Sequence, residues 1–408
     1  MIEQITIKNF KSFKDVTLKL GPLNIFIGAN ASGKSNFFDA LRVLQGIGYG
    51  FTIHEILDGK PKSATSEVWE GIRGGSRAIG FAFENGNKPT LFQVAGKLPD
   101  EGASFEFTIA FSAREGYLHE ECLSVSDEAI YDSSPEHNIA SGSSFSVRHY
   151  DGIKREPPCD TVRIEGDRPA LTQMTRRGLW VRMPVRSDLA ERVTRVLADM
   201  QRVDPSPALL RAYSQAYEIK RMGEHGENFA ALIRMICKDP GAKKAYLSWL
   251  RELRPRDVDD IDTRSGAIGE PLVVMKERNR VFLAPVLSDG TLRFAAIAAA
   301  FFQLDMPGIL TIEEIENGIH ASRLRLLVEL IRSQAAIGKT QVMVTTHSPV
   351  VLAWLRPEEY ATTFFCRREE ETGESQIIPL AEIPRFKEIA DKQSIGDLFT
   401  EGWLEEAL

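Results

Sequence analysis

The sequence predicts an α/β protein, and three observations along its 408 residues indicate this class. A short apolar run at residues 23–27 leads directly into a glycine-rich loop and then into a segment with helical spacing. Residues 84–166 read as short strands separated by Gly, Asp, Asn and Ser. The C-terminal part alternates apolar strands with helical segments, which is typical of a parallel sheet with crossover helices.

The N-terminal elements follow from hydrophobic spacing. Apolar residues recur from Ile2 to Phe10, and Val16, Leu18 and Leu20 alternate with polar residues, which predicts strands. Residues 23–27 form a continuous apolar run of the kind buried in a central sheet. The segment after Lys34, SNFFDALRVLQGI, has helical spacing, and we expect its helix to end near Gly46.

The middle of the chain changes from strands to helices. The strand signals of residues 84–166 include TLFQVAG, SFEFTIAFSA and SSFSVRHYDG, and we expect an irregular loop at residues 132–144. Between residues 186 and 254 the spacing predicts helices in the segments DLAERVTRVLADM, ENFAALIRMIC and AKKAYLSWLREL.

The C-terminal part begins with a predicted β-hairpin at residues 271–286, whose turn lies near Arg278 and Asn279. The elements expected after it are a helix at about 291–304, a strand at 308–312, a helix at about 321–336 and a strand at 341–345.

Composition limits the class of protein. The formal net charge of -7 does not favour attraction of the whole molecule to nucleic acid. The cysteines are scattered without CxxC spacing, so we expect unpaired thiols in a reducing compartment: Cys122, Cys159, Cys237 and Cys366. The N-terminus has no apolar signal region, and no window approaches the roughly 18 apolar residues of a membrane span. We expect a soluble cytoplasmic protein without a membrane partner.

The segment GANASGKS at residues 28–35 fits the pattern G-x-x-x-x-G-K-[ST] in full. Its glycines let backbone N–H groups close around phosphate oxygens, and the helix that follows directs its positive end toward them. Lys34 adds charge on the outer phosphates, and the Ser35 hydroxyl is placed to ligate Mg²⁺. A glycine- and serine-rich turn is the alternative. The residues predicted to bind ATP here are Asn30, Ala31, Ser32, Gly33, Lys34, Ser35 and Asn36.

A pair of acids follows the apolar strand that precedes residue 313. Alternation along a strand would send the carboxylates of Glu313 and Glu314 in different directions. We assign Glu313 to the magnesium shell and Glu314 to the attacking water, as a base or orienting group. Two solvated acids at a strand end are the alternative.

The segment LSDGTLR at residues 287–293 precedes an apolar helix. Ser288, Gly290 and a helix N-terminus would make a second anion cradle, and a second cradle suggests service to a neighbouring subunit. An ordinary Ser or Asp helix cap with a glycine turn is the alternative. His347 follows another apolar strand, where it could sense the terminal phosphate; a structural histidine is the alternative there.

The order of these motifs resembles the ATPase heads of the ABC superfamily, and within it the branch of RecF and the structural-maintenance-of-chromosomes (SMC) proteins more than the transporters. ITIKNFKSFKD resembles the first strand of that branch, GANASGKSN its phosphate loop and LSDGTLR its signature motif. IEEIENGIH resembles the IEEPENGLHP stretch of short RecF-like AAA-family ATPases without a nuclease domain, and TTHSP their His switch.

The resemblance implies a phosphate-loop ABC-type head with a β-rich lobe and an inserted helical subdomain. The parts expected are residues 1–83 with the phosphate loop, 84–180 as the β-rich lobe, 181–265 as the helical insertion, and 266–408 with the signature, the acids and the His switch. Gln173 resembles the glutamine of the family that contributes to the magnesium site. Ile315 and Ala321 depart from the family, which usually has proline at these two positions.

The resemblance also implies a head-to-tail homodimer that holds two ATP molecules with Mg²⁺ and opens on hydrolysis. Each site would combine two chains, with Lys34, Ser35, Glu313, Glu314 and His347 from one, and Ser288 and Gly290 from the other.

Two cellular roles remain open from the sequence. The first is a DNA-directed ATPase in repair or in defence against phage or plasmids, with phosphate contacts among Arg176, Arg177, Arg182, Arg186, Lys243 and Lys244, although such clusters are more often solvated faces. The second is a regulatory or scaffold ATPase that holds and releases a separate effector, such as a nuclease or toxin. A transporter ATPase fits the β-rich insertion and the LSDG variant poorly.

Overall fold

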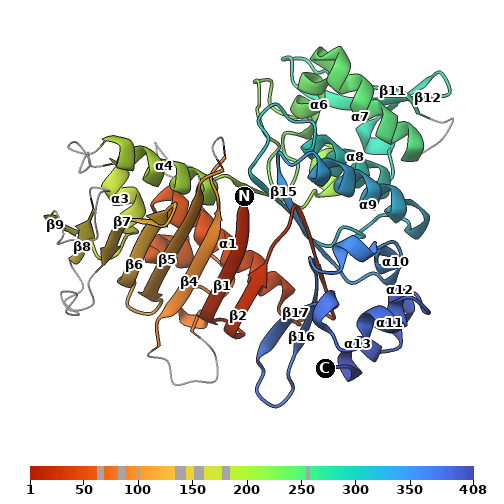
Figure 1. The fold of residues 1–408 in the computed structure, drawn as a ribbon. Coiled ribbons are helices and arrows are strands. Elements are labelled where there is room, and N and C mark those ends of the chain that lie inside the picture. Colours follow the sequence, from red (N-terminus) through yellow and green to blue (C-terminus); the bar gives the residue numbers. More distant parts are fainter. Residues whose placement is uncertain are drawn as a thin grey trace. The chain divides into compact units, whose positions relative to one another are not determined.

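Figure 1 shows the fold in a computed structural model, which describes residues 1–61, 69–80, 88–99, 102–133, 144–150, 160–176, 184–253 and 258–408. Helices and strands both run through the chain, so the predicted α/β class is confirmed. The chain forms two compact units and passes between them several times. Among the described residues, no helix is both long and apolar enough to cross a membrane.

The first unit comprises Met1–Gly21, Gly28–Met200 and Cys366–Ile378. Its strands are β1 (Ile2–Phe10), β2 (Phe13–Lys19), β4 (Thr90–Lys97), β5 (Ser104–Ser112), β6 (Tyr117–Val125), β7 (Glu128–Ser133), β8 (Phe145–His149) and β9 (Asp160–Ile164). They form one eight-stranded antiparallel sheet in the order β2-β1-β4-β5-β6-β7-β8-β9. The strands predicted within residues 84–166 are thus confirmed.

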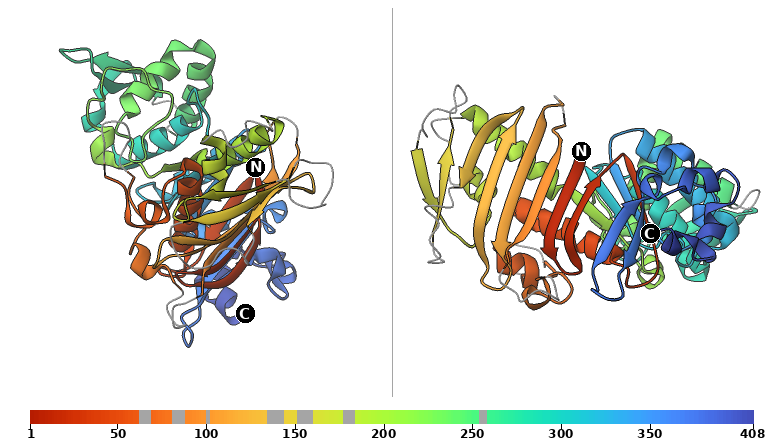
Figure 2. Two further views of the ribbon diagram at one scale, coloured as in Figure 1. Left: turned by 90° about the vertical axis from the view of Figure 1, so that its left-hand side faces the viewer. Right: turned by 60° about the horizontal axis from the view of Figure 1, so that its bottom comes forward.

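The core of the first unit is aromatic. Phe10, Phe92 and Phe111 are fully buried, and the ring centroids of Phe10 and Phe92 are 5.4 Å apart. The helices of this unit are α1 (Lys34–Tyr49), α2 (Ile53–Asp58), α3 (Ala170–Arg176) and α4 (Pro184–Ala198). In Figure 2, α1 and α4 lie along one face of the sheet, where they pack against each other.

Helix α1 ends at Tyr49, three residues beyond the predicted end near Gly46. Gly50 is the C-cap, in the left-handed conformation that glycine favours. Gly46 instead allows close packing, because a Cβ atom there would lie 2.8 Å from the side chain of Ile56. Gly48 likewise allows close packing, in this case against the backbone of Ala198 at the end of α4. Gly46 was misread as a helix stop because packing glycines and capping glycines look alike in sequence.

The second unit comprises Pro22–Ile27, Gln201–Phe365 and Pro379–Leu408. Most of its residues in strands belong to a six-stranded sheet of β3 (Leu23–Ile27), β10 (Met200–Val203), β14 (Ile309–Ile312), β15 (Gln341–Thr346), β16 (Thr363–Arg368) and β17 (Ser375–Pro379), of which Cys366–Ile378 is grouped with the first unit. Their order is β10-β14-β15-β3-β16-β17, and β14, β15, β3 and β16 are parallel. The register pairs Ile312 with Val344 and Thr346 with Ile27, so these strands end at a common edge.

The other elements of the second unit include a small antiparallel sheet, β11 (Val258–Ser265), β12 (Pro271–Glu277) and β13 (Arg280–Leu283). Its helices are α5 (Pro207–Leu210), α6 (Phe229–Lys238), α7 (Pro240–Leu253), α8 (Asp289–Ala300), α9 (Ala321–Ala336), α10 (Pro349–Leu352), α11 (Phe386–Ala390), α12 (Ile395–Thr400) and α13 (Trp403–Glu406). Helices α6 and α7 pack on this sheet, and α8 and α9 contact each other.

Several sequence expectations shift in detail. The hairpin turn at Arg278 and Asn279 is confirmed, and both residues have positive φ. Helix α8 begins and ends earlier than the expected 291–304 because Ser288 caps it. Strand β11 lies within the segment expected to be helical; its charged sequence, VDDIDTRS, is held by pairing with β12. Of the irregular loop expected at residues 132–144, the first two residues belong to β7, which continues to Ser133, and residues 134–143 lie outside the described residues.

Candidate functional site

The phosphate loop is shaped by two glycines. Gly28 has a φ of 147° and Gly33 a φ of 111°, both in the region that favours glycine. A Cβ atom at Gly28 would lie 2.2 Å from the carbonyl oxygen of Cys366, and one at Gly33 would lie 2.7 Å from the side chain of Ser375. The path of the loop therefore depends on having no side chain at these two positions.

Lys34 is the charged centre of the loop. Its side chain is buried, and its Nζ donates to the carbonyl oxygens of Gly28 at 2.6 Å and Ala29 at 2.7 Å. The Ser32 hydroxyl is also buried and has no hydrogen-bond partner within the described part of the chain. A buried ammonium group, an unsatisfied hydroxyl and a helix N-terminus together fit phosphate oxygens.

The remaining predicted loop residues differ in their surroundings. Asn30 and Ala31 are exposed, and Ala31 has a positive φ of 63°. Ser35 is half-buried in the first turn of α1, which no side chain caps. Asn36 donates from Nδ2 to the Ser12 Oγ at 2.7 Å and so anchors α1 to the turn between β1 and β2. The nucleotide contacts of these residues remain predictions.

The two acids directly follow strand β14 and do not continue it. Strand β14 ends at Ile312, and Glu314 has a φ of 47°. The argument from strand alternation is therefore wrong, because the backbone has already turned when it reaches the second acid. The N–H of Glu314 donates to the Thr345 Oγ1 at 2.8 Å, which ties the turn to β15. Its side chain is exposed, while Glu313 is half-buried.

Two arginines that sequence reasoning missed contact this turn. The Arg202 Nη2 lies 3.1 Å from the Glu313 Oε1. Arg293 is buried, and its Nη2 donates to the carbonyl oxygen of Glu313 at 3.3 Å while its Nη1 donates to Asp204 Oδ1 at 3.1 Å. Arg293 is the last residue of LSDGTLR, so its place in that motif was a usable signal. Arg202 carried no such signal.

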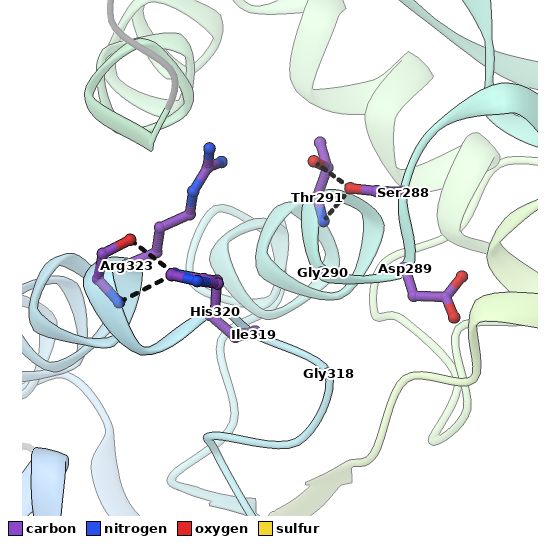
Figure 3. Close-up of a pocket in the computed structure, with 9 residues that line it drawn as sticks. Ser288, Asp289, Gly290, Thr291, Gly318, Ile319, His320 and Arg323 are labelled. Carbon is purple, nitrogen blue, oxygen red and sulfur yellow. Dashed lines mark hydrogen bonds between the residues drawn. The ribbon is translucent and has the colours of Figure 1, made fainter.

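An open cavity of about 620 Å³ lies where α8 and α9 begin (Figure 3). Its lining residues are Ser288, Asp289, Gly290, Thr291, Gly318, Ile319, His320, Ser322 and Arg323. Both helices start at this cavity, with Ser288 and His320 as their N-caps. Two helix N-termini and an arginine side chain favour an anion.

Ser288 and Gly290 occupy the positions that the sequence predicted for them, at the start of α8. The Ser288 Oγ accepts from the Thr291 N–H at 3.3 Å, so the ordinary helix cap is present and the anion role stays a prediction. A Cβ atom at Gly290 would lie 2.5 Å from the carbonyl oxygen of Gly318. Glycine is thus needed where α8 passes the loop after the acids. Arg323 and His320 were missed.

His347 directly follows β15 and is exposed, as its predicted role requires. Its backbone N–H donates to the Glu316 Oε1 at 2.7 Å, and its Nδ1 lies 3.0 Å from the same oxygen. The turn that carries Glu316 departs from the family pattern at Ile315. The N–H of Ile315 donates to the Thr345 carbonyl at 3.2 Å, a bond that proline could not form.

Gln173 makes contacts of a structural kind. Its side chain is buried, and its Nε2 donates to the carbonyl oxygens of Glu165 at 2.8 Å and Arg168 at 3.0 Å. Its Oε1 accepts from the Glu165 N–H at 3.0 Å. These bonds occupy the amide, and the magnesium role of Gln173 stays a prediction.

The basic residues suggested for DNA are distributed as follows. Lys243 lies 2.9 Å from Asp260 Oδ1, so its charge already has a partner, and Lys244 is exposed. Arg177 and Arg182 lie outside the described residues, and Arg176 and Arg186 lie on α3 and α4. Within the described ranges, no three His, Cys, Asp or Glu side chains group to hold a metal.

Comparison with protein families matches both ends of the chain. The family model described as "AAA ATPase domain" matches residues 1–52, which include the phosphate loop. The model described as "AAA domain, putative AbiEii toxin, Type IV TA system" matches residues 242–353, which include the signature, the acids and His347. These matches confirm the predicted resemblance to AAA-family ATPases, and with it the predicted class of enzyme.

Individual proteins are similar over different lengths. A Helicobacter pylori (strain ATCC 700392 / 26695) protein named "ATP/GTP phosphatase" is 24% identical over 391 residues, which cover 91% of this chain and 93% of that protein. The DNA replication and repair protein RecF of Lactococcus lactis subsp. cremoris (strain MG1363) is 46% identical over 44 residues, which cover 10% of this chain and 12% of that protein. A solved SMC head bound to the C-winged helix domain of ScpA is 15% identical, with a TM-score of 0.48 and coverage of 92% of this chain and 97% of that one.

Proposed function

We propose that this chain binds ATP with Mg²⁺, hydrolyses it to ADP and phosphate, and joins a second copy head to tail around two nucleotides. The observation that carries the proposal is the phosphate loop, in which a buried Lys34 and an unsatisfied Ser32 hydroxyl lie at the start of α1. The Helicobacter pylori relative, similar along nearly the whole chain and named as a phosphatase of ATP and GTP, supports the reaction.

The edge at which the parallel strands of the second unit end supports the roles proposed for the individual residues. Glu313 and Glu314 follow β14, His347 follows β15, and the phosphate loop follows β3 directly in the sequence. Since these strands are parallel neighbours, their carboxyl ends share one edge, where α/β proteins bind ligands.

In the proposed reaction, Lys34 holds the outer phosphates, and Ser35 with Glu313 holds Mg²⁺, which supplies charge neutralisation at the phosphates. Glu314 orients the attacking water and accepts its proton. His347 contacts the terminal phosphate. These residues supply positioning and charge stabilisation, which suffice for phosphoryl transfer.

The cavity at the starts of α8 and α9 would receive the terminal phosphate bound to the second copy, through Ser288, Gly290 and the helix N-termini. ATP would then hold two chains together, and hydrolysis would remove the group that both chains contact. The dimer would open as a consequence.

The test uses Glu314→Gln, with Glu382→Gln as a control because Glu382 is exposed on a different part of the second unit. We expect Glu314→Gln to lower the rate of ATP hydrolysis by about 100-fold or more while ATP binding persists. Light scattering after gel filtration with ATP should show a dimer of the variant. Hydrolysis at the wild-type rate would contradict the base assignment, and a monomer with ATP would contradict the composite site.

For the cellular role, we infer action in DNA repair or in defence against phage or plasmids. The AbiEii description of the matched family model favours defence, and the match to RecF covers only the phosphate-loop region. The second candidate is a scaffold that holds and releases a separate effector protein, without DNA. Stimulation of hydrolysis by DNA would support the first, and co-purification with the product of a neighbouring gene would support the second.

A further inference from the structure

We propose that Glu316 is the positioning residue for His347, and that its carboxylate holds the Nδ1–H of the imidazole so that Nε2 is left for the ligand. This inference rests on the proposed function for the identity of the ligand, the terminal phosphate of ATP, but the contact itself lies within the second unit.

The contact is close and enclosed. One oxygen of Glu316, Oε1, accepts from the His347 backbone N–H at 2.7 Å and lies 3.0 Å from the ring Nδ1. The Glu316 side chain is only 10% exposed, whereas the His347 side chain is 47% exposed. The imidazole ring therefore contacts a buried carboxylate on one side and is accessible to a ligand on the other.

The backbone of the turn fixes Glu316 before any ligand arrives. The N–H of Ile315 donates to the Thr345 carbonyl, and the N–H of Ile319 donates to the Glu316 carbonyl at 3.0 Å. Ile315 itself is 1% exposed and packs in the core. Because Ile315 and the carbonyl group of Glu316 itself are both anchored, the position of Glu316 relative to β15 is set by the fold.

A purely structural role, as acceptor for the His347 backbone N–H, does not account for the charge of Glu316. Its second oxygen, Oε2, is buried and has no hydrogen-bond partner among the described residues. Burying a carboxylate oxygen without a partner is unfavourable, and a neutral glutamine could accept the backbone N–H equally well. A carboxylate offers one thing that an amide does not, which is stabilisation of a positive charge on the ring beside it.

That charge matters for a ring that meets phosphate. With Nδ1–H directed at a carboxylate, the tautomer is fixed, and protonation of the ring lets Nε2–H donate to a phosphate oxygen. The pairing of a carboxylate, an imidazole and a charged ligand is a general device for orienting histidine. Glu316 thus acts through His347 and does not contact the ligand.

The first experiment is a double-mutant cycle with Glu316→Gln, His347→Ala and the combined variant. We expect Glu316→Gln to lower kcat for ATP hydrolysis by about 10–100-fold, the range for residues that orient a functional histidine, with KM for ATP changed by less than about threefold. In the His347→Ala background, Glu316→Gln should have no further effect on kcat. An equal loss of kcat in both backgrounds would overturn the proposal. Glu358→Gln, at an exposed position on the same unit, is the control.

The second experiment needs no activity. Nitrogen-15 NMR of histidine side chains, with His347→Ala to assign the signal, should show the His347 proton on Nδ1 in the wild type. In Glu316→Gln the ring should shift toward the other tautomer, while the melting temperature stays close to that of the wild type. A His347 signal unchanged by Glu316→Gln would overturn the proposal. Failure of the wild type to hydrolyse ATP would overturn the proposed function, and the NMR result would still decide the role of Glu316.

Discussion

The phosphate loop of the first unit and the acidic turn of the second, residues 313–319, are held in different ways. In the loop, Lys34 bonds to carbonyl groups five and six residues away. In the acidic turn, Glu314 bonds to a residue 31 positions away and Glu316 to another at the same separation. The hydrogen bonds of Lys34 are local, so one short motif can encode them, whereas the hydrogen bonds of the acidic turn depend on the fold of the whole unit.

The largest expected effect tests the local site. Lys34→Ala removes the buried ammonium group at the centre of the loop, and we expect ATP binding to weaken by at least about 100-fold, because charged hydrogen bonds to phosphate are lost. Isothermal titration with ATP and Mg²⁺ measures this. Lys8→Ala is a matched control, since Lys8 forms only an exposed ion pair with Asp15. Unchanged affinity in Lys34→Ala would remove this lysine from the site.

The second prediction tests the distant contacts. Arg293→Met leaves the carbonyl group of Glu313 and the carboxylate of Asp204 without their buried partner. We expect a loss of about 1–3 kcal/mol in the free energy of unfolding, because the Glu313 carbonyl group loses a partner, whereas the Asp204 carboxylate is 37% exposed and stays hydrated. Urea denaturation measures it.

Arg202→Met is the comparison variant, because the Arg202 side chain is 37% exposed and its ion pair with Glu313 should contribute at most about 1 kcal/mol. Equal losses of stability in the two variants would contradict the idea that Arg293 holds the acidic turn in place.

The same contrast explains what the sequence could predict. The phosphate loop and helix α9 were predictable, because a short motif and a regular apolar spacing carry all the information needed. The positive φ of Glu314 was not, because it depends on the Thr345 hydroxyl of a neighbouring strand. Nor was the pairing of Glu316 with His347, which requires the register of two parallel strands. Strand β11 was missed because pairing with β12 outweighed its weak local preference.

The third prediction tests the comparison between local contacts in the first unit and distant contacts in the second, because the first unit also contains a buried contact between distant residues. Glu121 is fully buried and accepts hydrogen bonds from the N–H groups of Ala170 and Leu171 at the start of α3, and from the Tyr131 hydroxyl. Burial raises the pKa of Glu121 to about 7 from its ordinary 4.5. Between these pH values the folded protein binds a proton that the unfolded chain has released, so this group makes the folded state less stable as pH rises.

Glu121→Gln should remove that contribution, which is about 3 kcal/mol at most between pH 4.5 and pH 7. The measurement is the difference in free energy of unfolding between wild type and variant, taken by urea denaturation at several pH values across this range. The free energy of unfolding of the variant should increase relative to that of the wild type as pH rises. A difference that stays constant with pH would show that Glu121 remains ionised in the folded state, with the hydrogen bonds outweighing burial.

The smallest effect is expected at Gly290, where α8 meets the loop that follows the acidic turn. In Gly290→Ala the new Cβ atom would lie 2.5 Å from the Gly318 carbonyl oxygen, so one of the two segments must shift. We expect a loss of about 2 kcal/mol in stability and a weaker ATP-dependent dimer, with ATP binding at the phosphate loop unchanged. Gly80→Ala is the matched control, since no atom of the described residues lies within 4 Å of a Cβ atom there. If Gly290→Ala weakened ATP binding by a single chain, the cavity and the phosphate loop would serve the same nucleotide within one chain, and the head-to-tail arrangement would be contradicted.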